Sequence, residues 1–128
     1  MRQKVKGFTL PELLLAAAIL GFVLVSLLFL FTSCLFLNES SRDLTFAVSH
    51  AEYVMEDIKN TSFPLIPAKA GTMDATAITA AGLTPMTSES IVTAVSGTGI
   101  LTVTVTVNWS QRGVRNRSAV LTTIIARP

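Results

Sequence analysis

The sequence is poor in the residues on which covalent cross-linking and catalysis depend. Its single cysteine, Cys34, excludes an intramolecular disulfide framework. Its single histidine, His50, cannot act as a base with a separate orienting partner, and Cys34 lies in an apolar run, so nucleophilic catalysis has no residues to carry it. Within residues 60–128 the only acids are Asp74 and Glu89, too few to surround a calcium ion. We therefore expect neither an enzyme nor a bound metal or cofactor.

Charged residues are also scarce, at 14% of the 128 residues, and they are unevenly placed. The 25 residues from Leu13 to Leu37 carry no charge, whereas about 20 apolar residues suffice to span a bilayer. Three cations, Arg2, Lys4 and Lys6, precede this run. Without residues 1–7 the chain has 7 Lys and Arg against 8 Asp and Glu, a formal charge of −1. Such a basic head stays on the cytoplasmic side, so the part after the run should be exported, and the basicity does not indicate a nucleic-acid partner.

The helix that begins in the apolar run is expected to continue well beyond it. Residues 38–43 are polar but include no proline or glycine that would end a helix. Apolar residues then recur at helical spacing, which predicts an amphipathic second half. They are Leu44, Ala47, Val48, Ala51, Val54, Met55 and Ile58. Because Pro64 and Pro67 forbid simple continuation, we predict one helix over about residues 8–60.

A different period marks the C-terminal part of the chain. In residues 101–109 apolar side chains alternate with Thr and Asn, the pattern of a half-buried strand. Residues 118–126 are rich in Val, Leu, Thr and Ile, and the polar residues 110–116 between these segments predict a hairpin loop. Residues 90–95 are a third expected strand. The segment 68–90 has little periodicity and is interpreted as a loop with room for a short strand or a turn of helix.

These elements predict an α+β protein in which one very long N-terminal helix packs on a small antiparallel sheet of about three to four strands, over about residues 90–127. A two-stranded hairpin is marginal alone, so one face of the sheet must pack on another element. The helical stripe over 44–58 is the only candidate for covering the apolar face of the clearest strand. That face carries Leu101, Val103, Val105 and Val107. His50, on an adjacent stripe of the helix, is interpreted as a helix–sheet or subunit contact.

The junction between the basic head and the apolar run carries the most specific motif of the chain. It reads Lys6-Gly7-Phe8-Thr9-Leu10-Pro11-Glu12-Leu13-Leu14. This junction resembles the N-terminus of type IV prepilins and of type II secretion pseudopilins, whose pattern is Gly-Phe-Thr-Leu-X-Glu followed by a long apolar run. The pattern is matched in full, with Pro11 at the variable position.

The resemblance implies that a prepilin peptidase cuts between Gly7 and Phe8 and methylates the new amine of Phe8. Residues 1–7 are then a cleaved leader, residues 8–37 the transmembrane and assembly half of the helix, and residues 38–128 the exported pilin-like domain. The resemblance also implies a single-pass location in the bacterial inner membrane before assembly into a pilus or pseudopilus. Its implied partners are other pilins or pseudopilins, the prepilin peptidase and an inner-membrane assembly platform.

Glu12 stands at the head of the apolar run, where an ionised carboxylate costs on the order of 3 kcal/mol. Its own chain offers no lasting cation nearby, because the basic residues of the head leave with the leader. The resemblance implies that the methylated amine on Phe8 of one subunit meets Glu12 of its neighbour as the helices stack in a filament. A simpler alternative places Glu12 at headgroup depth, where it favours the positive end of the helix dipole by roughly 0.3 to 1 kcal/mol.

Two alternatives for the apolar run are a lipoprotein signal and an ordinary secretory signal. Residues 31–34 resemble a lipobox, which would make the chain a lipoprotein with its lipid on Cys34. Against this, Phe31 stands where leucine is usual and residues 35–37 continue the run past the cut. An ordinary cleaved secretory signal has an apolar core of only about 7 to 15 residues, so this run is too long for one.

The predicted hairpin loop and the start of the next strand, near Trp109, contain three arginines, Arg112, Arg115 and Arg117. If this loop binds a ligand, the chain is a membrane-anchored adhesin or a DNA-binding pilin, which is a further alternative. Three arginines in a near-neutral domain make a small footprint for nucleic acid. We interpret them as a solvated loop that also protects the hairpin from edge pairing. Trp109 ends the alternating apolar face and is expected in the core.

The rest of the chain resembles the small minor pilins of the pilus-modification kind, and it is also similar to the small minor pseudopilin of type II secretion. The resemblance rests on the end of the helix, 51–59, and on the hairpin segments 104–109 and 120–123. The exported domain is short and lacks the C-terminal cysteine pair of many major pilins. We therefore expect a minor pilin that is assembled into or primes a type IV pilus, with a minor pseudopilin as the alternative.

Overall fold

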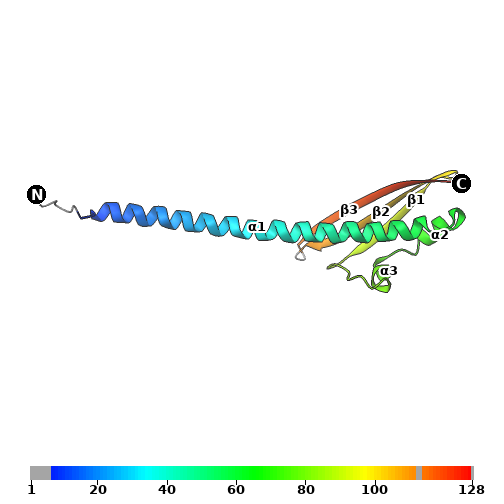
Figure 1. The fold of residues 1–128 in the computed structure, drawn as a ribbon, viewed down its shortest axis with the longest axis horizontal. Helices are drawn as coiled ribbons and strands as arrows, with labels where there is room; N and C mark the ends of the chain where they lie inside the picture. Colours follow the sequence, from blue (N-terminus) through cyan, green and yellow to red (C-terminus); the bar gives the residue numbers. More distant parts are fainter. Residues whose placement is uncertain (1–6, 112–113, 128) are drawn as a thin grey trace, which may run out of the picture. The chain divides into compact units, whose positions relative to one another are not determined.

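The structure, a computed structural model, describes residues 7–111 and 114–127, and these form the expected α+β fold (Figure 1). Its elements are α1 (Leu10–Lys59), η1 (Phe63–Leu65), α2 (Ile66–Ala70), α3 (Ala75–Ala80), β1 (Ser90–Ser96), β2 (Ile100–Gln111) and β3 (Arg115–Ala126). The prediction of one very long N-terminal helix and a small antiparallel sheet is confirmed. The chain forms two compact units, one up to residue 39 and one from residue 40 onward.

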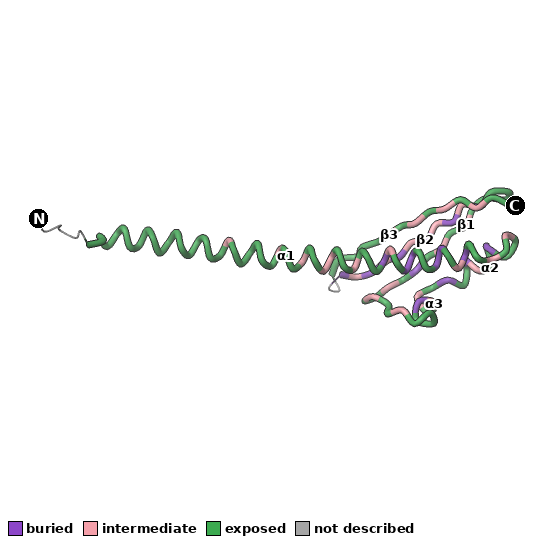
Figure 2. Tube along the Cα trace, viewed as in Figure 1, coloured by how far each residue is buried: buried purple, intermediate pink, exposed green. Residues whose placement is uncertain are grey.

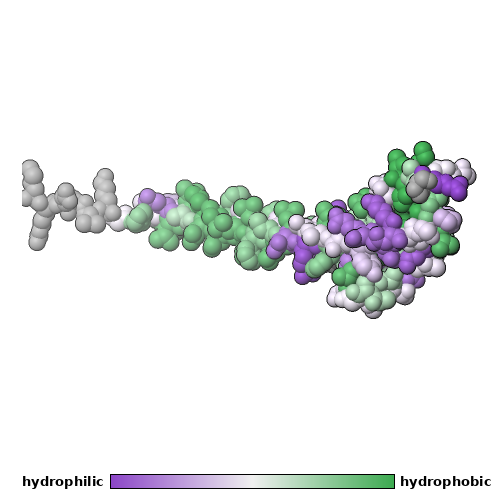
Figure 3. All heavy atoms as spheres, turned by 45° about the vertical axis from the view of Figure 1, so that its right-hand side comes forward, coloured by the Kyte–Doolittle hydropathy of each residue, from purple (hydrophilic) through white to green (hydrophobic). Residues whose placement is uncertain are grey.

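The described part of the first unit is mostly the apolar half of α1, whose residues are almost all exposed (Figure 2) and mostly hydrophobic (Figure 3). In the described part of the chain, α1 is the one helix long and apolar enough to cross a membrane. The hydroxyls of Ser26, Thr32 and Ser33 donate to the carbonyl oxygens of Phe22 and Phe29 at 2.8 to 2.9 Å. Each hydroxyl is therefore satisfied within its own helix, as a bilayer interior requires.

In the second unit, the later half of α1 packs on the inner face of the sheet. Its buried residues are Ala47, His50, Ala51, Val54, Met55 and Ile58. The sheet contributes Leu101, Val103, Val105, Val107 and Trp109, none more than 5% exposed. The predicted pairing of the stripe with this face is thus confirmed, including a core position for Trp109. The stripe is one turn shorter than predicted, because burial begins at Ala47 and Leu44 is 48% exposed.

The sheet has the strand order β1-β2-β3 and is antiparallel throughout. One row across it joins Val92, Thr106 and Val120 on the outer face. The turn between β1 and β2 depends on Gly97, whose φ is +106° and where an added Cβ would lie 2.0 Å from the carbonyl oxygen of Ile100. No side chain fits there, which fixes glycine at this turn.

The hairpin of β2 and β3 is longer than predicted. We expected a loop over 110–116, but the strands continue to Gln111 and begin again at Arg115, which pair with each other. The polarity of this stretch indicated a loop, yet the hydrogen bonds of a ladder are formed by the backbone and do not need apolar side chains. Arg112 lies outside the described residues.

For the segment 68–90 we expected a loop with a short strand or a turn of helix, and the structure places the end of α2 and all of α3 there. Asp74 caps α3, since its carboxylate accepts from the backbone nitrogen of Thr76 at 2.9 Å and from the Thr76 hydroxyl. These hydrogen bonds hold the pKa of the Asp74 carboxyl below its ordinary value, and the bond from the Thr76 hydroxyl has the largest effect. Ile66 and Ile78 are buried in the same core as α1 and β2, so packing stabilises helices too short to form alone.

Candidate functional site

The head of α1 leaves the predicted cleavage bond accessible. Gly7, Phe8 and Thr9 precede the helix in irregular backbone, and all three are exposed. The position of a Cβ at Gly7 has no atom within 4 Å, so the fold itself does not require a glycine there. The bond between Gly7 and Phe8 is therefore open to an enzyme that approaches the backbone.

Glu12 lies in the first turn of α1, whose start is closed by hydrogen bonds from the backbone nitrogens of Glu12 and Leu13 to the carbonyl oxygen of Thr9, both 3.1 Å. An acid at this position favours the positive end of the helix dipole. Within residues 7–111 and 114–127, Glu12 has no ion-pair partner. Its carboxylate is thus available to a cation from outside the described chain.

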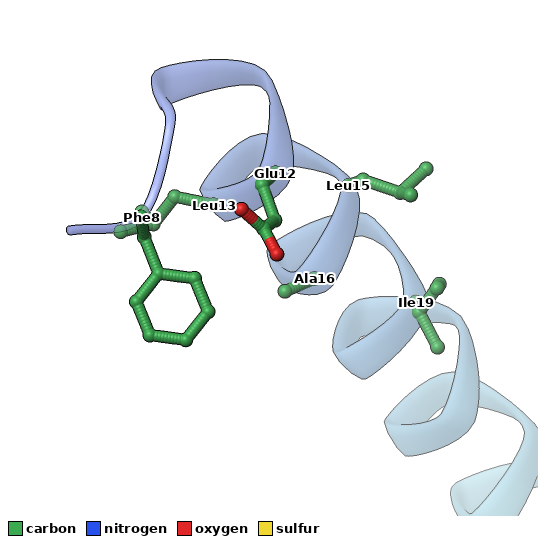
Figure 4. Close-up of a pocket in the computed structure, with 6 residues that line it drawn as sticks. All are labelled: Phe8, Glu12, Leu13, Leu15, Ala16 and Ile19. Atoms are coloured by element: carbon green, nitrogen blue, oxygen red, sulfur yellow. The ribbon is translucent and has the colours of Figure 1, made fainter. Parts of the chain in front are cut away.

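The side chain of Glu12 lies in a shallow apolar hollow (Figure 4). The hollow is lined by Phe8, Glu12, Leu13, Leu15, Ala16 and Ile19. The Phe8 ring lies on one side of the carboxylate, and Ala16, the smallest of the lining residues, lies below it. We did not single out Leu15, Ala16 or Ile19 from the sequence. Their spacing of three, four and seven residues from Glu12, which places them on one helix face, is the signal that could have found them.

A second polar constellation, also missed from the sequence, lies in the core of the second unit. His50 Nδ1 lies 2.8 Å from Glu89 Oε1, and the two side chains are only 3% and 1% exposed. The other carboxylate oxygen of Glu89 accepts from the backbone nitrogen of Met86 at 2.7 Å. The pair fastens the segment before β1 to α1. We expected His50 to form a helix–sheet or subunit contact, but its partner is Glu89, which lies in the irregular segment just before β1.

Replacing Glu89 by alanine should destabilise the second unit, because His50 and the backbone nitrogen of Met86 would be left buried without their acceptor. Breaking a buried pair by removing one partner costs about 3 kcal/mol or more. Denaturation of the full chain in detergent, followed by the fluorescence of Trp109, measures this loss. Glu52→Ala removes an exposed carboxylate from the same unit and should change stability by less than about 0.5 kcal/mol. Equal stability of the two variants would show that the His50–Glu89 pair does not stabilise the second unit.

The remaining candidate residues do not come together as a site. Arg115 and Arg117 belong to β3, opposite Gln111 and Trp109 of β2, instead of a loop. In the described part of the chain no three His, Cys, Asp or Glu residues lie close enough together to hold a metal ion.

Comparison with known proteins gives one result, and it falls on the head of α1. A family model described as the prokaryotic N-terminal methylation motif matches residues 2–28. No curated protein and no solved structure matches the chain. The matched range contains the accessible Gly7–Phe8 bond and the whole hollow around Glu12, so the comparison and the geometry single out the same segment.

Proposed function

Since residues 2–28 carry the prepilin methylation motif of type IV pilins and pseudopilins, we propose that the chain is a minor type IV pilin that is assembled into a pilus or primes its assembly. The motif implies processing by a prepilin peptidase and assembly with other pilins. The observation that carries the proposal is the carboxylate of Glu12, which has no ion-pair partner among the described residues and lies four residues after Phe8, the residue that follows the accessible cleavage bond.

Maturation would supply the missing charge. Cleavage between Gly7 and Phe8 frees an amine on Phe8, and a methylated amine still carries a positive charge. Phe8 lines the same hollow as Glu12, so the new cation forms beside the place where a neighbouring helix would dock. The amine of one subunit can thus meet Glu12 of the next when two such helices pack side by side.

The setting makes this ion pair selective. In an apolar environment an ionised carboxylate costs on the order of 3 kcal/mol, and a cation from a partner offsets that cost only when the two helices are in register. Leu15, Ala16 and Ile19 surround the carboxylate with apolar surface, and the small Ala16 allows close approach. Register between subunits is therefore set by one charged contact among many interchangeable apolar ones.

Membrane anchoring through the first half of α1 fits this role, with the N-terminus cytoplasmic and the second unit exported from the bacterial inner membrane. Cys34 is the single cysteine of the sequence, so the second unit has no cysteine pair like that of many major pilins, which favours a minor subunit over a major one. The same motif serves type II secretion, so a minor pseudopilin is the second candidate. The two candidates share the whole of this mechanism and differ in the filament that incorporates the subunit.

Glu12→Gln tests the contact, because it keeps the size of the side chain and removes its charge. Membrane insertion and leader cleavage should survive, while crosslinking between mature subunits at equal protein level should fall about tenfold, as expected for the loss of a charge-assisted hydrogen bond. Glu12→Leu should lose crosslinking equally and insert at least as well, since the insertion penalty disappears with the carboxylate. Glu52→Gln, an exposed acid of the second unit, is the control and should crosslink normally.

The alternative role of Glu12, at headgroup depth, has a different signature. It requires normal incorporation of both Glu12 variants with only a small change in stability. Unchanged crosslinking in both would therefore remove Glu12 as the assembly contact while leaving the cleavage motif intact.

A further inference from the structure

β3 forms one edge of the three-stranded sheet, and within the described residues no strand pairs with its outer side. Proteins usually protect such an edge with charges, proline, a bulge or a very short strand. β3 spans 12 residues, and the nine from Ser118 to Ala126 contain no charge, no proline and no glycine. The row of unpaired backbone donors and acceptors on this edge is therefore long and unprotected.

The side chains of β3 also leave apolar surface open on both faces of the edge. Val120 and Ile124 on the outer face are 58% and 70% exposed. Leu121 and Ile125 on the inner face are only half-buried, so α1 does not fully cover the sheet at this side. A further strand laid along β3 would continue both apolar layers.

The opposite edge differs, which makes β3 the better docking strand. β1 has 7 residues instead of 12, and α2 packs against it. Its outward Val92 is 55% exposed and lies in the same row as Val120, so the two edges offer comparable side chains but unequal lengths of free backbone. An extended segment gains most of its hydrogen bonds from backbone, which favours the longer edge.

Charge at the two ends of β3 selects the occupant. The uncharged stretch is bounded by Arg117 on one side and Arg127 on the other, both exposed. An antiparallel second copy centred on Thr122 would place Arg117 opposite Arg127 at both ends, and a parallel copy in register would place each arginine beside itself. Like charges directly opposite each other in a sheet are destabilising, so a second copy of β3 is disfavoured.

We propose that the outer edge of β3 binds an extended, uncharged segment of another protein that carries acidic residues at both of its ends. The segment joins the sheet as a fourth strand, with its acids beside Arg117 and Arg127. This docking edge belongs to the second unit, and it does not depend on cleavage of the leader or on Glu12.

The test uses the full chain in detergent micelles and a fluorescent synthetic peptide of nine alternating valines and threonines with two glutamates at each end. Fluorescence anisotropy should show binding at least about tenfold tighter than that of the same peptide with lysines at its ends. The double charge reversal Arg117→Glu and Arg127→Glu should invert this preference. Replacing every second residue of the peptide by proline, which cannot donate to a ladder, should abolish binding.

Side-chain variants then locate the binding edge. Val120→Lys together with Ile124→Lys adds the charges with which natural edges are protected, and should weaken the glutamate-ended peptide about tenfold even though two cations are added. Val92→Lys is the matched control on the same row at the opposite edge, and should leave affinity within about twofold. Trp109 emission, unchanged in all these variants, reports that the core is intact.

Three results would overturn the proposal. If the peptides with glutamate ends and with lysine ends bind equally, Arg117 and Arg127 do not select the segment. If Val92→Lys weakens binding as much as the Val120 and Ile124 substitutions do, the peptide does not bind at the edge of β3. Sedimentation that shows dimers of the chain abolished by the Val120 and Ile124 substitutions would assign the edge to a second copy. None of these results bears on Glu12 crosslinking, so failure here is distinguishable from failure of the proposed pilin function.

Discussion

Gly7→Val is expected to leave the chain entirely as uncleaved precursor. A peptidase at the membrane face must bring its active site against the backbone of the bond that it cuts, and a branched side chain beside that bond obstructs the approach. The effect cannot come from the fold, because a Cβ at Gly7 has no atom within 4 Å. Mass spectrometry of the membrane fraction measures it directly. The wild-type chain should begin at methyl-Phe8, whereas the variant should keep residues 1–7 and an unmethylated Phe8.

Gly21→Val is the matched control. It makes the same substitution at a glycine inside the apolar half of α1, where a Cβ also meets nothing within 4 Å. This variant should insert into the membrane and be cleaved like the wild type. A Gly7→Val chain that begins at methyl-Phe8 would contradict the assignment of this bond, and an unprocessed Gly21→Val chain would show that valine acts through the helix instead.

The features that the sequence predicted well are those that depend on neighbouring residues. The span of α1, observed as Leu10–Lys59, followed from a charge-free run, a helical stripe and the absence of proline or glycine between them. β1 and the centre of β2 followed from short-range composition and alternation. The motif at the head of α1 is likewise contiguous, which is why the junction 6–14 could be recognised from the sequence and lies within residues 2–28, the range that the family model matches.

What the sequence did not predict depends on residues far apart. His50 and Glu89 are 39 positions apart, and nothing local to either residue indicates that the chain brings them to 2.8 Å. The exposure of Leu44 depends on where along α1 the sheet begins to pack against the helix, and helical periodicity cannot locate that boundary. α2 and α3 have only 5 and 6 residues, too few to show a helical period, and they are stabilised by the burial of Ile66 and Ile78 in the core.

The exposed edge of β3 was missed for a related reason. The arginines near the hairpin were interpreted as protection against edge pairing, but the ladder places Arg115 and Arg117 at one end of β3. The long uncharged stretch beyond them lies unprotected. Which strand is an edge is a property of strand order, and strand order cannot be read from the periodicity of a single strand.

Val105→Asp is expected to unfold the second unit. Val105 is fully buried at the centre of β2, and the core cluster to which it belongs consists of hydrophobic residues, the stripe of α1 included. A buried carboxylate without a partner costs several kcal/mol, which is comparable to the whole stability of a small domain, about 5 to 15 kcal/mol. Trp109 is the single tryptophan of the chain and is 5% exposed, so its emission reports on this core alone. Its emission should shift to the red in the variant at a temperature where the wild type is folded.

Thr106→Asp provides the comparison that separates burial from the mere presence of a charge in the strand. Thr106 is the next residue of β2, has its side chain on the outer face and is only half-buried, so an aspartate there can reach water. Its melting temperature should fall by only a few degrees, as for an ordinary surface substitution of roughly 1 kcal/mol or less. We expect the apolar half of α1 to stay helical in detergent whether or not the second unit is folded, so helix content is a poor measure of unfolding. Trp109 emission, together with limited proteolysis of the full chain, is the decisive measurement. If Val105→Asp melts at the same temperature as Thr106→Asp, Val105 faces solvent and the packing of α1 on β2 is wrong.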